Sequence, residues 1–306
     1  MRFTMIKIFK VAMTILLTNT VIISLSACSK PSTQQSDTAN AATTQAINTQ
    51  GTNENSKPPS SIAIQVGSDI TFPPFEYYDN KTPVGFDIEL MNKIAEQNHQ
   101  TVNFVDTRFT NLFSGLEGKK YDMIVSAIYI TPERLKKFDM IPYFTSNQVV
   151  FVKKESTYEP KEAMDLCGKK VAVLKGSVLV NQLGDISKNK CEAISKPALI
   201  IKEYPTSPEA ILALMSGQAD AQYEDTAAAN EALKKLGDKI KITSTDSFFP
   251  MVAGVLVRKG DKSNYDFFSN GLARLKTSGE YAELLKKYGL KEPTEAEITA
   301  VMAKKS

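Results

Sequence analysis

The sequence has one histidine among 306 residues and only three cysteines, so two common metal-ligating residue types are scarce. The histidine, His99, lies in the polar stretch AEQNHQ, which is typical of a solvated helix end. With no cysteine near it, His99 supplies neither a zinc site nor the base of a Ser-His or Cys-His catalytic pair. The motifs GxxxxGK[ST], GxSxG and HExxH are absent as well. We therefore expect no metal, no cofactor and no enzyme of these classes.

The sequence has almost no net charge once its first residues are set apart. Residues 1–27 contain Arg2, Lys7 and Lys10 and no acidic residue, so removing these three from the 37 basic residues leaves 34, against 34 acidic residues. The excess of basic residues therefore belongs to the N-terminal segment. Because nucleic-acid binding needs a basic surface on the folded domain, we expect no nucleic-acid partner.

The N-terminal segment has the pattern of a secretory signal peptide. Its basic residues precede an apolar run over residues 11–23, which is short for a membrane span, and small residues follow ahead of Cys28. The sequence LSAC at residues 25–28 resembles the bacterial lipobox, which implies cleavage after residue 27 and lipid chains on Cys28. We expect an exported lipoprotein, anchored to a membrane facing the periplasm or the cell exterior. A single uncleaved N-terminal anchor helix is the alternative.

Residues 28–60 consist mainly of Ser, Thr, Gln, Asn, Ala and Pro, with almost no large apolar side chain. Such a segment cannot bury enough surface to become ordered, so we interpret it as a disordered tether. Further along, the two remaining cysteines, Cys167 and Cys191, favour a disulfide in an exported protein. In the loop-entropy description, a disulfide that closes a loop of this size stabilises the fold by about 3.5 kcal/mol.

From residue 61, strand and helix patterns alternate in two similar units. The apolar spacing predicts strand, helix, strand, helix, strand over residues 62–128, and a similar alternation over residues 169–237. This order implies parallel strands with helical crossovers, so we predict an α/β fold of two lobes. The C-terminal strand and two helices are too few for a third domain and are expected to complete the first lobe. The predicted boundaries are residues 61–152 and 251–306 for lobe 1 and residues 153–250 for lobe 2. Two chain crossings between the lobes predict a hinged cleft that suits a small ligand.

Arg134 is the first candidate for a ligand contact. Thr131 suits a helix N-cap and Pro132 the first helical position, so Arg134 falls in the first turn, where free backbone N–H groups favour an anion. A guanidinium there adds a forked, permanently charged donor that fits a carboxylate. The alternative is a surface ion pair with Glu133 or Asp139.

Other candidates also follow predicted parallel strands, whose carboxyl ends collect functional residues. Asp225 is either the N-cap of the next helix or an acceptor for an ammonium group. Ser177, after Gly176, is either an N-cap or a hydroxyl that contacts an anion. Asp69 is either a ligand contact or an ordinary turn residue. The phenylalanines Phe72 and Phe109 either wall a pocket or belong to the core.

Five motifs over residues 61–291 resemble, in order, the polar amino-acid binding proteins of bacterial ABC transporters, extracellular solute-binding family three. They are GSDITFPPFEYYD, VGFDIELMNKIA, GLEGKKYDMIVSAIYITPERLKKFDMIPYF, GKKVAVLKGS and SGQADAQYED. The resemblance implies a two-lobe periplasmic-binding-protein fold of type II. In that fold each lobe is a mostly parallel sheet flanked by helices, and two hinge strands join the lobes. The segments DLCGKKVAV and NKCEAISKPA resemble a subgroup with two cysteines in lobe 2, which supports the disulfide.

The resemblance also implies how a free amino acid would be held before its delivery to membrane permease subunits. Arg134 would bind the α-carboxylate with help from Ser177. Asp225 and the backbone carbonyl of Ala127 would bind the α-ammonium group.

The ligand side chain would lie between Phe72 and Phe109, with Ser126 lining the same pocket. Asp69 would face the far end of this side chain, which favours a basic or polar amino acid. Two positions depart from the family. Tyr129 stands where the family usually has Ser or Thr, and Val178 replaces a second hydroxyl found in some members.

Two other functions remain open. Periplasmic cyclohexadienyl dehydratases have a similar fold, and in them a carboxylate in the cleft acts as an acid. A ligand-sensing module for a receptor is the other alternative, and it would need a separate membrane partner. The sequence offers no evident proton donor in the cleft, so a binding protein without catalytic residues is the preferred interpretation.

Overall fold

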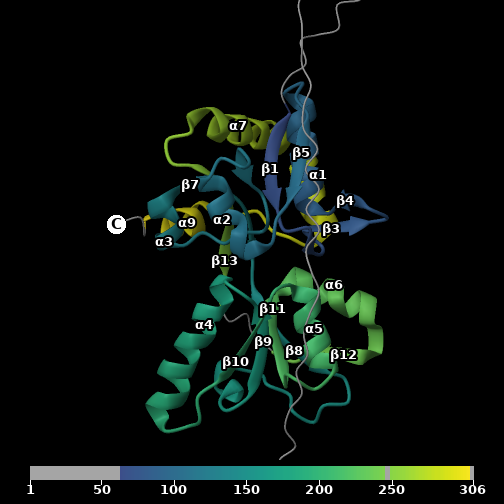
Figure 1. Ribbon diagram of the computed structural model, residues 1–306, viewed down its shortest axis with the longest axis vertical. Helices are drawn as coiled ribbons and strands as arrows, with labels where there is room; N and C mark the ends of the chain where they lie inside the picture. The colour runs from purple at the N-terminus through teal and green to yellow at the C-terminus, as the bar shows by residue number, and fades with distance from the viewer. Residues whose placement is uncertain (1–62, 245–248, 304–306) are drawn as a thin grey trace, which may run out of the picture. The chain divides into compact units, whose positions relative to one another are not determined.

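The computed structural model describes residues 63–244 and 249–303 (Figure 1). The predicted signal peptide, the predicted lipid site at Cys28 and the predicted tether lie outside these residues. Within the described part of the chain, none of the helices is both long and apolar enough to cross a membrane.

The first sheet has five strands in the order β5-β1-β6-β13-β7. Their bounds are Ile64–Ser68 for β1, Val102–Asp106 for β5, Met123–Ile124 for β6, Phe138–Ser146 for β7 and Met251–Arg258 for β13. Strand β1 runs parallel to β5 and β6, whereas β13 runs antiparallel to β6 and β7. The C-terminal part of the chain thus returns to this sheet through β13. We call this sheet and its helices lobe 1.

Helices cover the first sheet because each has an apolar face at helical spacing. They are α1 (Phe86–Gln97), α2 (Phe109–Glu117), α7 (Lys262–Ser278) and α8 (Glu280–Tyr288). On α1, residues Phe86, Leu90 and Ile94 are fully buried. Helix α7 packs closely against α1, because a Cβ atom at Gly271 would lie only 2.5 Å from the Cγ2 atom of Ile94.

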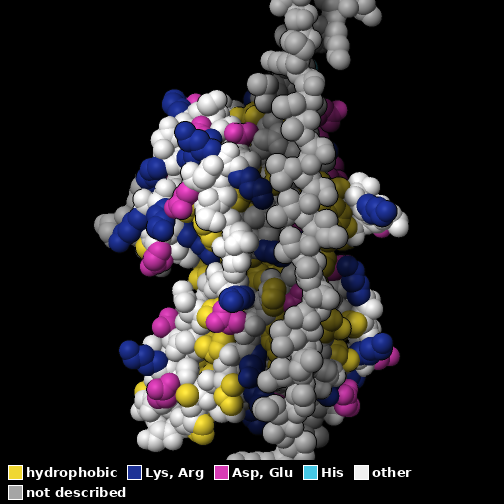
Figure 2. All heavy atoms as spheres, in the orientation of Figure 1, with side chains coloured by type: hydrophobic (Ala, Val, Ile, Leu, Met, Phe, Trp, Pro, Cys, Tyr) yellow, Lys and Arg dark blue, Asp and Glu magenta, His cyan; other side chains and the backbone are white. Residues whose placement is uncertain are grey.

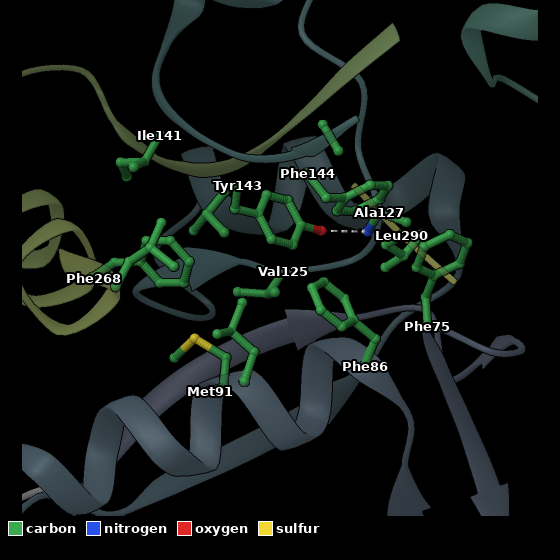
Figure 3. Packing of buried hydrophobic residues seen from close by; sticks show 14 of the residues in the cluster. Phe75, Phe86, Met91, Val125, Ala127, Ile141, Tyr143, Phe144, Phe268 and Leu290 are labelled. Atoms are coloured by element: carbon green, nitrogen blue, oxygen red, sulfur yellow. Dashed lines mark hydrogen bonds between the residues drawn. The ribbon is translucent and has the colours of Figure 1, made fainter. Parts of the chain in front are cut away.

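The core of lobe 1 is rich in aromatic rings (Figure 3). The ring of Phe144 packs edge-to-face on Phe86, with centroids 5.6 Å apart, and stacks with Phe75 at 5.2 Å. In the same cluster, the buried N–H group of Ala127 donates to the hydroxyl oxygen of Tyr143 over 3.1 Å. The core therefore extends to the strand end that carries Ala127.

The second sheet also has five strands, in the order β10-β9-β11-β8-β12. Their bounds are Gln148–Lys153 for β8, Lys170–Leu174 for β9, Ile200–Tyr204 for β10, Ala221–Asp225 for β11 and Ile240–Ile242 for β12. The helices are α4 (Val178–Ile186), α5 (Ser207–Met215) and α6 (Thr226–Leu236). In Figure 1, α4 and α5 lie on either side of strands β9 to β11. We call this unit lobe 2.

The predicted α/β class and the two sheets are confirmed, but two of the four strand pairings in each sheet are antiparallel. The antiparallel strands adjoin the crossings between the lobes. The first crossing is the single residue Asn147, between β7 and β8. The boundary predicted from the sequence lies after residue 152, whereas strand β8 pairs in the second sheet.

Smaller elements complete lobe 1. A three-stranded sheet consists of β2 (Thr71–Phe72), β3 (Glu76–Asp79) and β4 (Thr82–Val84). Helix α3 (Pro132–Lys137) precedes β7, and α9 (Glu295–Met302) packs against α3 and β13. On the face seen in Figure 2, basic and acidic side chains are interspersed, as the near-equal numbers of the two signs lead one to expect.

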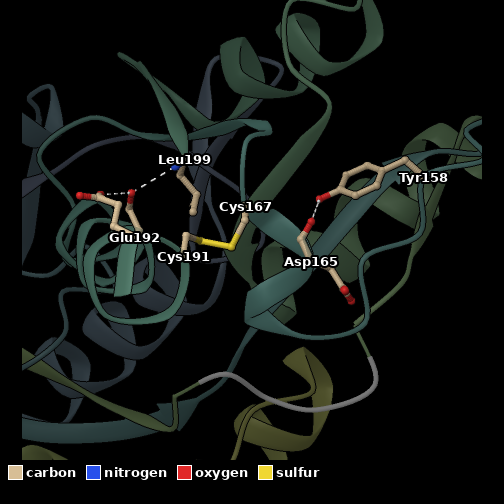
Figure 4. Close-up of a disulfide and its surroundings, with 7 residues drawn as sticks. Tyr158, Asp165, Cys167, Cys191, Glu192 and Leu199 are labelled. Carbon is tan, nitrogen blue, oxygen red and sulfur yellow. Dashed lines mark hydrogen bonds between the residues drawn. A yellow bond between two sulfur atoms is a disulfide. The ribbon is translucent and has the colours of Figure 1, made fainter. Parts of the chain in front are cut away.

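A disulfide joins Cys167 and Cys191 within lobe 2, with 5.5 Å between their Cα atoms (Figure 4). Cys167 follows the 3-10 helix Ala163–Leu166, and Cys191 ends a π-helical turn, Ser187–Cys191, that continues from α4. The bond therefore ties the segment before β9 to the segment after α4. The predicted pairing is confirmed.

Candidate ligand-binding cleft

Arg134 lies in the first turn of α3, as its cap residues predict. The hydroxyl oxygen of Thr131 accepts a hydrogen bond from the Arg134 N–H over 3.3 Å. The guanidinium donates to the carbonyl oxygen of Tyr129 over 2.6 Å, and its Cζ atom lies 5.0 Å from the centroid of the Phe113 ring. These contacts leave most of its five N–H groups available.

Arg134 has no ion-pair partner among residues 63–244 and 249–303. Of the two acids considered for it, Glu133 is exposed and Asp139 pairs with Lys259 over 2.9 Å. Burial lowers the pKa of Arg134 to about 10, and Glu133 opposes this shift only in part. At neutral pH the group is therefore still a cation, and no carboxylate of the described residues pairs with it, although buried charges are normally paired.

Asp225 ends β11 and caps α6. Its Oδ1 atom accepts from the N–H groups of Ala227 and Ala228 over 2.7 and 3.3 Å, so the N-cap alternative is realised. Its Oδ2 atom accepts from the hydroxyl group of Tyr129, which belongs to lobe 1. Burial raises the pKa of Asp225, although these hydrogen bonds oppose the rise. One carboxylate oxygen thus caps α6 within lobe 2, and the other accepts a hydrogen bond from lobe 1.

Eight of the nine predicted ligand-contacting residues line one cavity between the two lobes. They are Phe72, Phe109, Ser126, Ala127, Tyr129, Arg134, Ser177 and Asp225. Val178, the other position that departs from the family, lines it too. The cavity measures about 30 Å³, which is room for about one water molecule. The structure therefore brings these residues together around a cavity that is too small for an amino acid.

Ser177 and Ser126 line this cavity with their hydroxyl groups already engaged. The Ser177 hydroxyl donates to the carbonyl oxygen of Leu174 over 2.7 Å and does not cap α4, although Ser177 is its N-cap residue. The Ser126 hydroxyl donates to Glu76 over 2.7 Å and accepts from the Asp69 N–H over 3.1 Å. The Ser177 hydroxyl could donate to a ligand carboxylate only after its bond to the Leu174 carbonyl oxygen is broken.

Asp69 is the predicted residue that the structure does not bring to the cavity. Its Oδ1 atom accepts from the hydroxyl group of Thr71 over 2.8 Å and pairs with Arg108. Its Oδ2 atom accepts from the backbone N–H of Phe109 over 2.8 Å. Both oxygens therefore have partners within lobe 1, where Arg108 pairs with Asp69 and also with Asp106.

Comparison with known proteins identifies the family and the fold. Residues 64–291 match the bacterial extracellular solute-binding proteins, family 3. The chain belongs to this family. The resemblance inferred from the five motifs is thereby confirmed, and α9 lies beyond the matched region.

This solute-binding protein has relatives with named ligands. It is 30% identical over 225 residues to the ABC transporter arginine-binding protein 1 of Escherichia coli K12, a match that covers 72% of this chain and 88% of that protein. It is 31% identical over 238 residues to a probable histidine-binding protein of Neisseria gonorrhoeae, a match that covers 76% of this chain and 85% of that protein. The solved structure of an ancestral arginine-binding protein bound to arginine matches this fold with a TM-score of 0.67 and 31% sequence identity. The match covers 74% of this chain and 97% of that one. The two-lobe fold predicted from the sequence is confirmed.

The sequence analysis missed Glu224, a second buried carboxyl group in the cavity wall. It is only 2% exposed and lies on β11 next to Asp225. Its oxygens accept from the Ser207 hydroxyl, from the Gln222 side-chain amide over 3.0 Å and from the Asp225 N–H over 3.0 Å. Burial outweighs these bonds and raises the pKa of Glu224 to about 7. The only sequence signal was a second acidic residue directly before Asp225 at the end of the strand.

A buried carboxyl pair, Glu76 and Asp87, lies behind the cavity wall and was also missed. Asp87 accepts from the Ala127 N–H over 2.8 Å and from the Tyr143 hydroxyl over 3.1 Å. The two carboxyl groups are hydrogen-bonded to each other, which needs a proton on one of them, and no other described residue is a hydrogen-bond partner of Glu76 Oε2 or Asp87 Oδ1. Burial raises the pKa of Asp87 to about 6 and that of Glu76 well above its ordinary range, where the neighbouring charge of Asp87 adds to the shift. The pair holds Ser126 and Ala127 in place.

Proposed function

We propose that this protein binds a free amino acid in the cavity between its lobes and delivers it to the membrane subunits of an ABC transporter. The observation that carries the proposal is the Arg134 guanidinium of lobe 1, which has no ion-pair partner in the described part of the chain and shares a small cavity with the buried Asp225 carboxylate of lobe 2. A cation and an anion on opposite walls complement the carboxylate and the ammonium group of a zwitterion. The lobes would separate to admit the ligand and close over it.

The charges in the cavity wall favour a basic amino acid over an acidic one. Lobe 1 contributes one cation, Arg134, and lobe 2 contributes the carboxylate of Asp225 and the carboxyl group of Glu224, whose charged form a cationic group of the ligand would favour. A basic amino acid brings one carboxylate and two cationic groups, which is the complementary set. Asp69 does not add to this preference, because it pairs with Arg108 and does not line the cavity. Among the named ligands of the relatives, arginine and histidine agree with it, whereas cystine has no basic side chain.

Further parts of the proposal concern the whole chain. Membership in an extracellular family supports export. We infer in addition that residues 1–27 are a lipoprotein signal peptide, that Cys28 carries the lipid anchor, and that residues 28–60 tether the folded part to the membrane. The lobes act as two domains hinged at their crossings, and Phe72 and Phe109 enclose the ligand side chain.

The proposal is tested with the protein lacking residues 1–28. Thermal-shift screening of the twenty amino acids and ornithine, followed by calorimetry, should single out arginine, lysine, ornithine or histidine, or a polar amino acid such as glutamine. A ligand well above its dissociation constant should stabilise the protein by about 3 kcal/mol. The amino acid should be recovered unchanged after denaturation, whereas conversion to a product would indicate an enzyme. Tighter binding of aspartate or glutamate would contradict the charge argument.

Substitution of Arg134 tests the carboxylate contact directly. Arg134→Ala should weaken binding at least about 100-fold, because the ligand carboxylate would then be buried without its partner. The fold should be retained, as far-UV circular dichroism would report. Arg274→Ala is the matched control, because Arg274 is exposed on α7 and does not line the cavity. Undiminished binding by the Arg134 variant would reject the assignment.

A further inference from the structure

Tyr129 contacts both halves of the proposed zwitterion site. Its side chain is 7% exposed, and its hydroxyl group crosses from lobe 1 to donate to the Oδ2 atom of Asp225 in lobe 2. Its backbone carbonyl accepts from the Arg134 guanidinium over 2.6 Å. A single residue thus engages the group proposed for the ligand ammonium and orients the group proposed for the ligand carboxylate.

The hydroxyl group of Tyr129 and a ligand ammonium group need the same oxygen atom. The Oδ1 atom of Asp225 is already shared by two backbone N–H groups of α6, so Oδ2 is the oxygen that remains for a ligand. In the closed structure Tyr129 donates to this atom. Both groups are hydrogen-bond donors, and a charged acceptor makes either bond a strong one.

Space leads to the same conclusion as hydrogen bonding. The cavity of about 30 Å³ has no room for an amino acid while the Tyr129 ring lies in its wall. A ligand can therefore occupy the site only if the lobes separate or the ring moves away. Either movement breaks the bond between Tyr129 and Asp225, which joins the two lobes.

We propose that Tyr129 is an internal substitute for the ligand: its hydroxyl group occupies the ammonium position on Asp225 in the closed, ligand-free protein, and the amino acid must displace it. The inference rests on the proposed function of this cavity and adds a residue that sets its affinity. Tyr129 holds the empty cleft closed, and it lowers the apparent affinity because each binding event must first break the bond that it makes. Small ligands that cannot replace this bond are thereby rejected.

The test is Tyr129→Phe, which keeps the ring and removes the hydroxyl group. Calorimetry with the amino acid selected by the screen should show binding roughly tenfold tighter than in the wild type, because a hydrogen bond to a charged group no longer competes. Tyr281→Phe is the matched control, because Tyr281 is a buried tyrosine of lobe 1 whose hydroxyl has no partner in the described part of the chain. The control should bind like the wild type.

A measurement without ligand accompanies the affinities. Small-angle X-ray scattering of the ligand-free proteins should give a larger radius of gyration for Tyr129→Phe than for the wild type and Tyr281→Phe, and ligand should bring the three values together. Equal or weaker binding by Tyr129→Phe would overturn the inference, as would identical scattering of the ligand-free proteins. If the wild type binds no amino acid, it is the proposed function that fails, and the scattering comparison still tests whether the hydroxyl group holds the lobes together.

Discussion

Replacing Glu224 with Gln should make the stability of the protein less dependent on pH. Glu224 is 2% exposed, and burial raises its pKa from an ordinary 4.5 to about 7. Between these two values the folded protein holds a proton that the unfolded chain has released. The free energy of unfolding therefore falls as the pH rises through this window, and it levels off above about pH 7.

The magnitude follows from the size of the pKa difference. A rise from 4.5 to about 7 is about 2.5 pH units, and at 1.36 kcal/mol per unit it corresponds to about 3 kcal/mol of stability. The side chain is almost wholly buried, so solvent screening removes little of this effect. In Glu224→Gln the side chain at this position is not ionisable. Between about pH 4.5 and pH 7.5 the free energy of unfolding of this variant should therefore fall by about 3 kcal/mol less than that of the wild type.

Urea denaturation followed by tyrosine fluorescence and far-UV circular dichroism measures this difference, since the sequence contains no tryptophan. Burial also raises the pKa values of Asp87 and Glu76, so these two residues make the free energy of unfolding fall with rising pH in both proteins alike. Glu117→Gln removes an exposed carboxylate near the end of α2 and should behave like the wild type. If wild type and Glu224→Gln lose the same stability to within about 0.5 kcal/mol, the reasoning on burial is refuted.

Two further predictions concern the scaffold of each lobe. Replacing Cys167 and Cys191 together with Ser should lower the free energy of unfolding by about 3.5 kcal/mol, and a reductant should then have no additional effect in urea titrations. Gly271→Ala should lower it by about 1–3 kcal/mol, because the new Cβ atom would meet Ile94 at 2.5 Å. Gly184→Ala in α4 meets no atom within 4 Å and should raise it by about 0.5–1 kcal/mol. The two glycine variants should therefore change the free energy of unfolding in opposite directions, and equal changes would contradict this reasoning.

Local features of the fold could be predicted because they depend on residues close together in the sequence. Thr131 and Pro132 specified the start of α3 and hence the position of Arg134. Apolar spacing gave the alternation of strands and helices. The same spacing does not encode strand direction, so the antiparallel pairing of β13 with β7 could not be predicted. Nor could it assign β8 to a lobe, because an apolar run fits either sheet.

The parts of the site that were missed depend on partners far apart in the chain. Asp69 looked available for a ligand because nothing local marks its pairing with Arg108, which lies 39 residues later. Glu224 could not be predicted because it lies one residue before the end of its strand, and its burial depends on the tertiary fold. Tyr129 stood out as a departure from the family, but its bond to Asp225 spans 96 residues and follows only from the closure of the two lobes.

The single-residue crossing at Asn147 has a consequence for affinity. Asn147 connects β7 to β8, and its carbonyl oxygen accepts from the Thr226 N–H over 2.8 Å, at the start of the helix that Asp225 caps. Each lobe contributes part of the cavity wall. Once a ligand is bound to one lobe, its binding to the other lobe is therefore an intramolecular step. The crossings set the effective concentration of the second half around the first. A substitution at Asn147 could therefore change the dissociation constant through this local concentration, although Asn147 is not part of the cavity wall.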